Sequence, residues 1–189
     1  MVRTDDLNTL PDNLPIPDDD GATDHLVGVR LPTLTLPATA GTAVDLAALP
    51  GWTIVYIYPR TGRPDEPTPT GWDAIPGARG CTPQSCAFRD HYAELQALDA
   101  AVFGLSTQAT DYQREVAERL HLPFSLLSDA DLHLTKALRL PTFEVDDMTL
   151  NKRLTLIIRD GIIEHVFYPV FPPDANAGNV LAWLSEHQD

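Results

Sequence analysis

Residues 52–59, WTIVYIYP, form a continuous run of apolar, β-branched and aromatic side chains that ends at Pro59. A run with no polar interruption is typical of a central strand that is covered on both faces. A second such run, AVFGLS at 101–106, follows a segment whose apolar residues recur on one helical face: Phe88, Tyr92, Leu95 and Leu98. Buried strands that alternate with helices predict an α/β domain with a central mixed sheet flanked by helices on both faces.

Several further elements are expected along the chain. The strongest is a hairpin over 153–168, RLTLIIRDGIIEHVFY, with Asp160-Gly161 at its turn. The weaker patterns predict an edge strand at 31–37, a helical turn at 43–49, a helix capped by Thr110 or Asp111, a short strand within 121–129, a short helix over 129–138 and a closing helix over 174–187.

The domain organisation follows from length and proline content. A chain of 189 residues is long enough for one domain with a substantial core. Residues 1–26 are acidic and proline-rich and predict a flexible N-terminal arm, which leaves 27–189 as the domain. Within the domain, the 22 residues of 59–80 contain five Pro and four Gly. A loop of that length is either functional or a surface elaboration, and the sequence favours neither reading.

Charge and hydropathy exclude some classes of function. The formal net charge is −14, from 13 Lys+Arg against 27 Asp+Glu, which disfavours binding to nucleic acid or to anionic membranes. No apolar run is long enough to cross a bilayer, and the N-terminus lacks the apolar segment of a secretory signal. We therefore expect a cytoplasmic protein that acts on a small or uncharged substrate. In that compartment a disulfide is more often catalytic or redox-sensing than structural.

Both cysteines, Cys81 and Cys86, lie in the segment GARGCTPQSCAFRD at 77–90. Cys81 follows the first buried strand, and reactive groups collect beyond the carboxyl ends of such strands. Thr82 and Pro83 fit the N-cap and the first position of a helix, or the helix begins a few residues earlier, and either start leaves Cys81 at its N-terminal end. Cys81 is therefore expected at the positive end of a helix, where a thiolate is favoured.

The spacing of the two cysteines bears on their role. In one regular helix their Cα atoms would be about 8.7 Å apart, beyond the roughly 7 Å limit for a disulfide. The pair is therefore not a static staple, but inert core thiols and a zinc site that includes His91 remain as alternatives. Arg79 and Arg89 could assist a thiolate or simply be solvated. His91 could carry protons, although a solvated histidine is the more common case.

The chain contains, in this order, the segments IVYIYP, GCTPQSCAFRDHYAEL, VFGLSTQATDYQREVAERLHLPFSLLSD and RLTLIIRDGIIEHVF. Together they resemble the peroxiredoxins, most closely the bacterioferritin comigratory protein (PrxQ) group, over about residues 28–187. The resemblance implies a thioredoxin-like fold and a thiol peroxidase that needs no cofactor or metal. It also implies hydrogen peroxide or small organic hydroperoxides as substrates. We expect a monomer or weak dimer.

The resemblance also implies roles for single residues. Cys81 matches the peroxidatic cysteine, which becomes a sulfenic acid. Cys86 matches the resolving cysteine, which forms an intramolecular disulfide with Cys81 that a thioredoxin-like dithiol reductant reopens. Arg153 matches the arginine that favours the thiolate and holds the peroxide oxygens. The rival interpretation is a redox sensor or binding module that uses the same disulfide as a switch.

One position departs from the family pattern. The motif places a threonine three residues before the peroxidatic cysteine, and this chain has Ala78 there. Four threonines are candidates to supply the missing hydroxyl: Thr61, Thr68, Thr70 and Thr82. For the peroxide pocket itself the expected residues are Pro59, Thr82 and Pro76.

Overall fold

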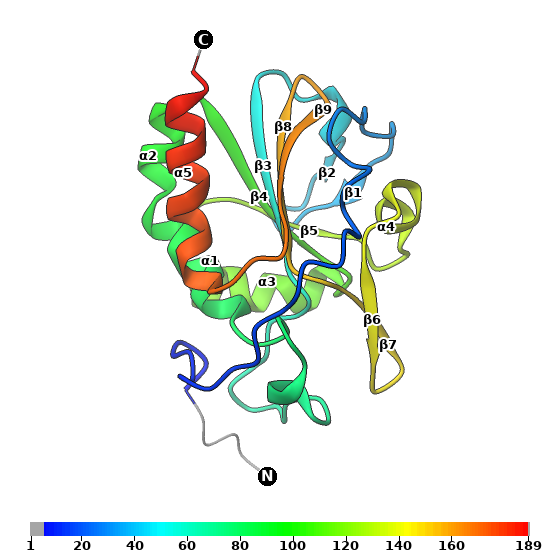
Figure 1. The fold of residues 1–189 in the computed structure, drawn as a ribbon, viewed down its shortest axis with the longest axis vertical. Helices are drawn as coiled ribbons and strands as arrows, with labels where there is room; N and C mark the ends of the chain where they lie inside the picture. Colours follow the sequence, from blue (N-terminus) through cyan, green and yellow to red (C-terminus); the bar gives the residue numbers. More distant parts are fainter. Residues whose placement is uncertain (1–5, 189) are drawn as a thin grey trace.

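Strand β3 (Trp52–Ile57) lies at the centre of a five-stranded sheet with the order β5-β4-β3-β8-β9 (Figure 1). The structure is a computed structural model that describes residues 6–188. The other strands of this sheet are β4 (Ala100–Ser106), β5 (Leu126–Ser128), β8 (Leu154–Arg159) and β9 (Ile162–Phe167). Strand β3 is parallel to β4 and antiparallel to β8, and all six of its residues are buried. The prediction of a central strand in a mixed sheet is confirmed.

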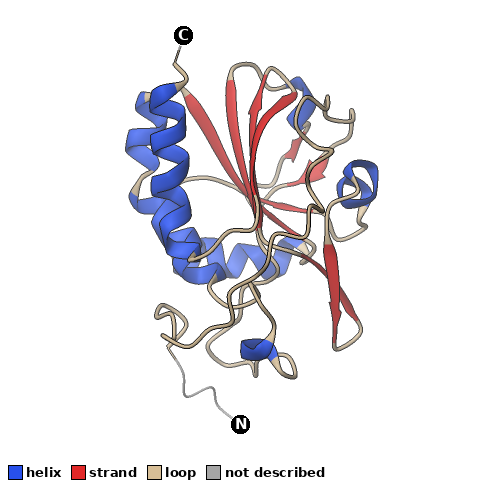
Figure 2. Cartoon of the chain, in the orientation of Figure 1, coloured by secondary structure: helices blue, strands red, loops and turns tan. Residues whose placement is uncertain are grey.

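Helices cover both faces of the sheet, as predicted (Figure 2). The helices are α1 (Cys81–Asp90), α2 (Tyr92–Ala97), α3 (Thr110–Arg119), α4 (His133–Leu138) and α5 (Asn176–Glu186), with 3-10 turns η1 (Leu46–Ala48), η2 (Trp72–Ala74) and η3 (Pro173–Ala175). Ile54 and Tyr56 of β3 pack against α1, α3 and α5, whereas Val55 and Ile57 pack against α4 and the chain before β3. Between residues 6 and 188, no helix has both the length and the hydropathy that crossing a membrane requires.

Two short hairpins lie outside the main sheet. One pairs β1 (Leu36–Pro37) with β2 (Ala43–Val44), so the predicted edge strand over 31–37 is reduced to two residues. The other pairs β6 (Thr142–Val145) with β7 (Met148–Asn151), and the sequence analysis did not predict it. The predicted cap of α3 is wrong, because Ala109 is the N-cap and Thr110 is the first helical residue.

Helix α1 is fixed to the central strand by aromatic stacking and a buried hydrogen bond. The rings of Phe88 and Tyr56 are nearly parallel, with centroids 4.4 Å apart. The Tyr56 hydroxyl donates to Ser85 Oγ at 3.1 Å. Burial raises the pKa of Tyr56 well above its usual value, so the phenol stays a neutral hydrogen-bond donor. The N-terminal end of α1 is therefore held in a defined place relative to β3.

Residues 6–26 contain no helix or strand, but they lie against the domain, whereas the sequence predicted a flexible arm. Leu26 is fully buried in the core. Lys152 Nζ and the Tyr168 hydroxyl each donate to the Asp20 carboxylate at 2.7 Å. These partners are more than a hundred residues away along the chain, so local composition could not reveal them. Residues 1–5 of the predicted arm lie outside the described residues.

The Asp20 contacts predict a pH-dependent attachment of the arm. Hydrogen bonds from Lys152 and Tyr168 lower the pKa of Asp20 to about 2. Since the folded pKa is depressed, the stabilisation is complete above the ordinary carboxyl pKa of about 4 and is lost as the pH falls toward 2. We expect Asp20→Asn to speed amide hydrogen exchange in residues 6–20 a few-fold at neutral pH, after correction for intrinsic rates. Asp18→Asn is the control, and equal exchange in the two variants would contradict this role.

Candidate active site

Cys81 is the first residue of α1, at the carboxyl-end edge of β3, as the sequence predicted. The chain enters the helix through Gly80, which has a φ of 107° and is the N-cap. A Cβ at Gly80 would collide with Pro173, so both the backbone conformation and the space require glycine. The predicted cap is therefore wrong by two positions, because Thr82 is already the second helical residue.

The start of α1 presents unpaired hydrogen-bond donors beside the sulfur. The first intrahelical hydrogen bond in this turn runs from Gln84 N to Gly80 O at 3.0 Å. Among residues 6–188, the amide N–H groups of Cys81 and Thr82 have no acceptor. Such free amides, together with the helix dipole, favour negative charge at this position. Cys81 itself is only 4% exposed.

Arg153, just before β8, reaches the sulfur from the sheet side. Its Nη2 donates to Cys81 Sγ at 3.2 Å. The same nitrogen contacts the carbonyls of Ala78 and Arg79 at 3.1 and 3.2 Å, and Nε donates to the Gly77 carbonyl at 3.3 Å. The guanidinium therefore holds residues 77–79, directly before α1, in place and also contacts the cysteine.

The environment of Arg153 lacks a carboxylate partner. Its side chain is 3% exposed, and no Asp or Glu among residues 6–188 forms a salt bridge with it. Its Nη1 donates to Gln84 Oε1, and Gln84 Nε2 donates in turn to Asn176 at 3.0 Å. Neutral groups satisfy the hydrogen bonds of the guanidinium but leave its charge unbalanced. The Cys81 sulfur lies next to this buried positive charge, which a thiolate there would balance.

Cys86 lies about 1.4 turns further along α1, and both thiols are free. It is partly buried, and burial raises its pKa, an effect that the nearby Arg89 opposes. Because both cysteines lie in one regular helix, their Cα atoms are about 8.7 Å apart by helical geometry. A disulfide therefore requires the first turn of α1 to unwind.

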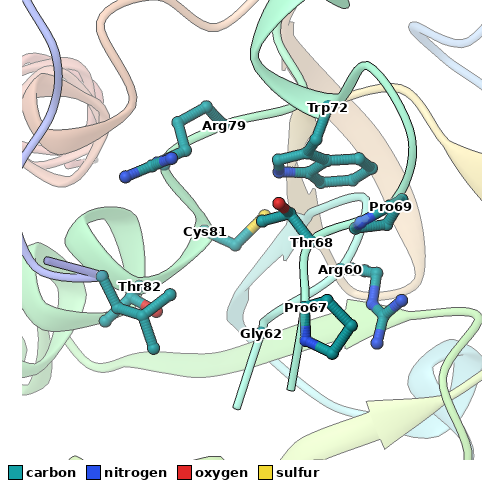
Figure 3. A pocket seen from close by; sticks show the side chains of 11 residues that line it. Arg60, Gly62, Pro67, Thr68, Pro69, Trp72, Arg79, Cys81 and Thr82 are labelled. Atoms are coloured by element: carbon teal, nitrogen blue, oxygen red, sulfur yellow. The ribbon is translucent and has the colours of Figure 1, made fainter. Parts of the chain in front are cut away.

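A small pocket opens beside the sulfur (Figure 3). It offers about 20 Å³ to the centre of a water-sized molecule, compared with the roughly 10–15 Å³ that one water needs. Thr82 lines it, whereas Pro59 and Pro76, the other two residues expected around the peroxide, do not. Pro59 is buried, and the exposed Pro76 borders a different hollow.

Most of the pocket wall comes from residues far from Cys81 in sequence. The loop 59–80 supplies Arg60, Gly62, Pro67, Thr68, Pro69 and Trp72, together with Arg79 and Gly80 directly before Cys81, and the N-terminal arm supplies Leu7. Trp72 is buried and packs against Ala78 and Leu150. The loop is therefore a wall of the pocket and not merely a surface elaboration. Only its unusual length signalled this; nothing in the sequence marked Leu7.

Arg153 does not line this pocket, although it contacts the sulfur. It borders the hollow that Pro76 lines. The resemblance implied that Arg153 also holds the peroxide oxygens, and the residues that face the pocket do not include it.

The other polar candidates near α1 have local partners. The His91 ring and the Glu94 carboxylate are 2.8 Å apart on the exposed surface. Arg89 donates to the Leu120 carbonyl and to Asp90, both at 2.9 Å. Neither His91 nor Arg89 lines the pocket.

A thioredoxin-like sheet with a buried cysteine at the N-terminal end of a helix indicates a thiol-based redox protein. Comparison with known proteins identifies its family. The family model described as Redoxin matches residues 26–181. Peroxiredoxin Bcp of Escherichia coli strain K12 is 32% identical over 165 residues, which are 82% of this chain and 93% of the relative. Chloroplastic peroxiredoxin Q of Oryza sativa subsp. japonica is 30% identical over 83% of this chain, which spans 65% of that relative's length.

Among solved structures, peroxidoxin BcpB from Mycobacterium tuberculosis superposes with a TM-score of 0.71 at 26% identity, covering 87% of this chain and 100% of the other. The chain therefore belongs to the redoxin family and is a peroxiredoxin of the PrxQ/Bcp group. The thioredoxin-like fold that the sequence resemblance implied is confirmed.

Proposed function

We propose that this chain is a thiol-dependent peroxidase that reduces hydrogen peroxide and small organic hydroperoxides at Cys81. Cys86 resolves the oxidised sulfur as an intramolecular disulfide, and a thioredoxin-like dithiol recycles both thiols. The observation that carries the proposal is the contact of the buried Arg153 guanidinium with Cys81 Sγ at 3.2 Å, in the absence of a carboxylate partner for Arg153 among the described residues. That contact favours the nucleophilic form of the sulfur.

The first step is attack on the peroxide. The Cys81 thiolate attacks the distal oxygen of the hydroperoxide, the O–O bond breaks, and its electron pair leaves on the proximal oxygen. The sulfur becomes a sulfenic acid, and the departing alkoxide or hydroxide takes a proton from water. The narrow pocket supports a preference for small peroxides, because it has room for little more than one water-sized molecule.

The second step is resolution. The Cys86 thiol attacks the sulfenic sulfur, a disulfide forms, and water leaves with the sulfenic oxygen. The first turn of α1 unwinds for this step, which breaks hydrogen bonds such as Gln84 N to Gly80 O. Phe88, stacked on Tyr56, anchors the rest of the helix while the first turn opens. A reductant dithiol then reaches the disulfide and returns both cysteines to thiols by exchange.

This cycle fits a cytoplasmic setting, where thioredoxin-type reductants keep thiols reduced. The same chemistry would serve a redox sensor, which would be oxidised once per signal. The test is to supply peroxide together with thioredoxin, thioredoxin reductase and NADPH and to follow NADPH. Sustained consumption over many equivalents of peroxide supports the enzyme. A single equivalent consumed per protein would contradict it.

The Cys86→Ser variant separates the two chemical steps. We expect it to lose one thiol per equivalent of peroxide, where the wild type loses two, because the sulfenic acid at Cys81 has no partner. The rate of that first oxidation should remain within about three-fold of the wild type, since Cys86 does not line the pocket. Thiol titration and mass spectrometry of a trapped sulfenic acid measure both quantities.

The outcome with thioredoxin completes this test. We expect Cys86→Ser to turn over with a small monothiol but not with thioredoxin at the wild-type rate, because it forms no intramolecular disulfide. If Cys86→Ser blocks the first oxidation, the two cysteines have the opposite roles.

A further inference from the structure

We propose that Thr68, on the 59–80 loop, is the hydroxyl that binds the reacting peroxide; this inference rests on the proposed peroxidase function. Thr68 and Cys81 line the same water-sized pocket. In Figure 3 the Thr68 hydroxyl points toward the Cys81 sulfur. Ala78 occupies the position where the family motif has a threonine. It is fully buried and carries no hydroxyl.

A hydrogen-bond donor inside the pocket would assist the reaction, and Arg153 does not line the pocket. As the O–O bond breaks, negative charge builds on the leaving oxygen, and a fixed donor there lowers the barrier. Arg153 lies outside the pocket, and its N–H groups already serve Gly77, Ala78, Gln84 and the sulfur itself. Thr68 is exposed and makes no hydrogen bond within the described part of the chain, so its hydroxyl is available to a ligand.

Thr68 is held in position from both sides. It lies between Pro67 and Pro69, whose rings restrict the local backbone. Before it, Glu66 accepts a hydrogen bond of 2.8 Å from the Tyr112 hydroxyl on α3. After it, Thr70 N donates to Asp146 at the β6–β7 turn at 2.8 Å.

Further contacts hold Tyr112, the α3 residue that binds Glu66, in position. Arg60 Nη2 donates to the Tyr112 hydroxyl at 3.0 Å, and the Arg63 guanidinium lies over the Tyr112 ring, 4.3 Å from its centroid. On the other side of the loop, Trp72 packs in a small apolar cluster with Phe143 and Val145. The loop on both sides of Thr68 is therefore anchored, and the exposed Thr68 side chain lines the pocket from this anchored segment.

In the reaction, the Thr68 O–H donates to the proximal oxygen of the hydroperoxide while Cys81 attacks the distal one. The threonine stays neutral throughout, and the proton that finally neutralises the leaving oxygen comes from water. The role is that of a hydrogen-bond donor to substrate, which makes Thr68 a catalytic residue supplied by the loop.

The test compares threonine variants in the Cys86→Ser background, where oxidation stops at the sulfenic acid. We expect Thr68→Val to lower the rate of Cys81 oxidation by hydrogen peroxide roughly 10- to 100-fold, the loss typical of one hydrogen bond to a charged group. Thr68→Ser restores most of the rate. Thr70→Val is the matched control, because Thr70 lies on the same loop and does not line the pocket. Thr70→Val should leave the rate of Cys81 oxidation equal to that of the Cys86→Ser protein.

A second readout separates substrate binding from damage to the site. Alkylation of Cys81 by iodoacetamide involves no peroxide oxygen, so Thr68→Val should leave its rate within about two-fold. A parallel loss of alkylation would mean a disturbed thiol and would overturn the inference.

The remaining outcomes distinguish the inference from the function on which it rests. If the Cys86→Ser protein reacts with peroxide and Thr68→Val reacts equally fast, Thr68 has no such role and the peroxidase proposal stands. If Thr82→Val, and not Thr68→Val, slows the reaction, the hydroxyl belongs to Thr82 and the inference is wrong. If the Cys86→Ser protein ignores peroxide, both proposals fail.

Discussion

Cys81→Ser is expected to abolish peroxide consumption, with a loss of roughly three orders of magnitude or more. The substitution keeps the shape of the side chain and removes the thiol, and a serine hydroxyl at neutral pH neither ionises nor accepts an oxygen atom from a peroxide. The measurement is NADPH oxidation coupled through thioredoxin, together with direct peroxide loss. Residual activity should equal the reaction without protein.

The Cys81→Ser result is informative only if the fold is intact. The thermal midpoint should move little, because the Sγ contacts, to Arg153 at 3.2 Å and to the Ala78 carbonyl at 3.7 Å, have counterparts in a serine hydroxyl. Cys86→Ser is the matched control, since it removes the other thiol of the same helix. If Cys81→Ser retains peroxide consumption and Cys86→Ser loses it, the nucleophile is Cys86 and the site described above is not the reaction centre.

The sequence predicted the parts of the fold whose causes are local. The unbroken apolar run of 52–59 specifies a strand covered on both faces, and Asp160-Gly161 specifies a tight hairpin because both residues adopt positive φ. The β6–β7 hairpin was missed because its turn is Asp146-Asp147. Both of these residues have positive φ without glycine, which propensity does not anticipate.

Parts of the candidate site could be predicted where residues lie close in sequence or match a family motif. Cys81 at a helix start and Arg153 beside it are examples. The pocket wall was predicted poorly, because Leu7 and Thr68 approach Cys81 only through long-range packing. The predicted N-cap of α1 lies two residues too late because Thr82-Pro83 has the composition of a cap. The actual N-cap is Gly80, whose positive φ is a conformation that threonine rarely adopts. Local preference was overridden there by the tight packing of Pro173 against the turn.

Arg153→Met is expected to slow the first oxidation of Cys81 by hydrogen peroxide roughly 100-fold or more. Methionine fills similar volume but supplies neither the charge nor the Nη2 donor that lies 3.2 Å from Sγ. Because Arg153 acts on the sulfur and not within the pocket, the loss should extend to alkylation by iodoacetamide at neutral pH. Quenched-flow oxidation and alkylation rates measure the two effects. The loss of both rates distinguishes Arg153 from Thr68, because Thr68→Val is expected to slow only the reaction with peroxide and not the alkylation.

Arg153 also has a structural role that the experiment must separate from its effect on the sulfur. Its removal takes the guanidinium donor away from the carbonyls of Gly77, Ala78 and Arg79, at a cost of about 1–3 kcal/mol for each buried group that is left unpaired. Arg153→Lys keeps the positive charge and loses the planar fork, so we expect comparable destabilisation but a smaller loss of reactivity. Arg159→Met, at the other end of β8, controls for net charge. If Arg153→Met is folded and both of its rates match the wild type, the guanidinium does not activate Cys81.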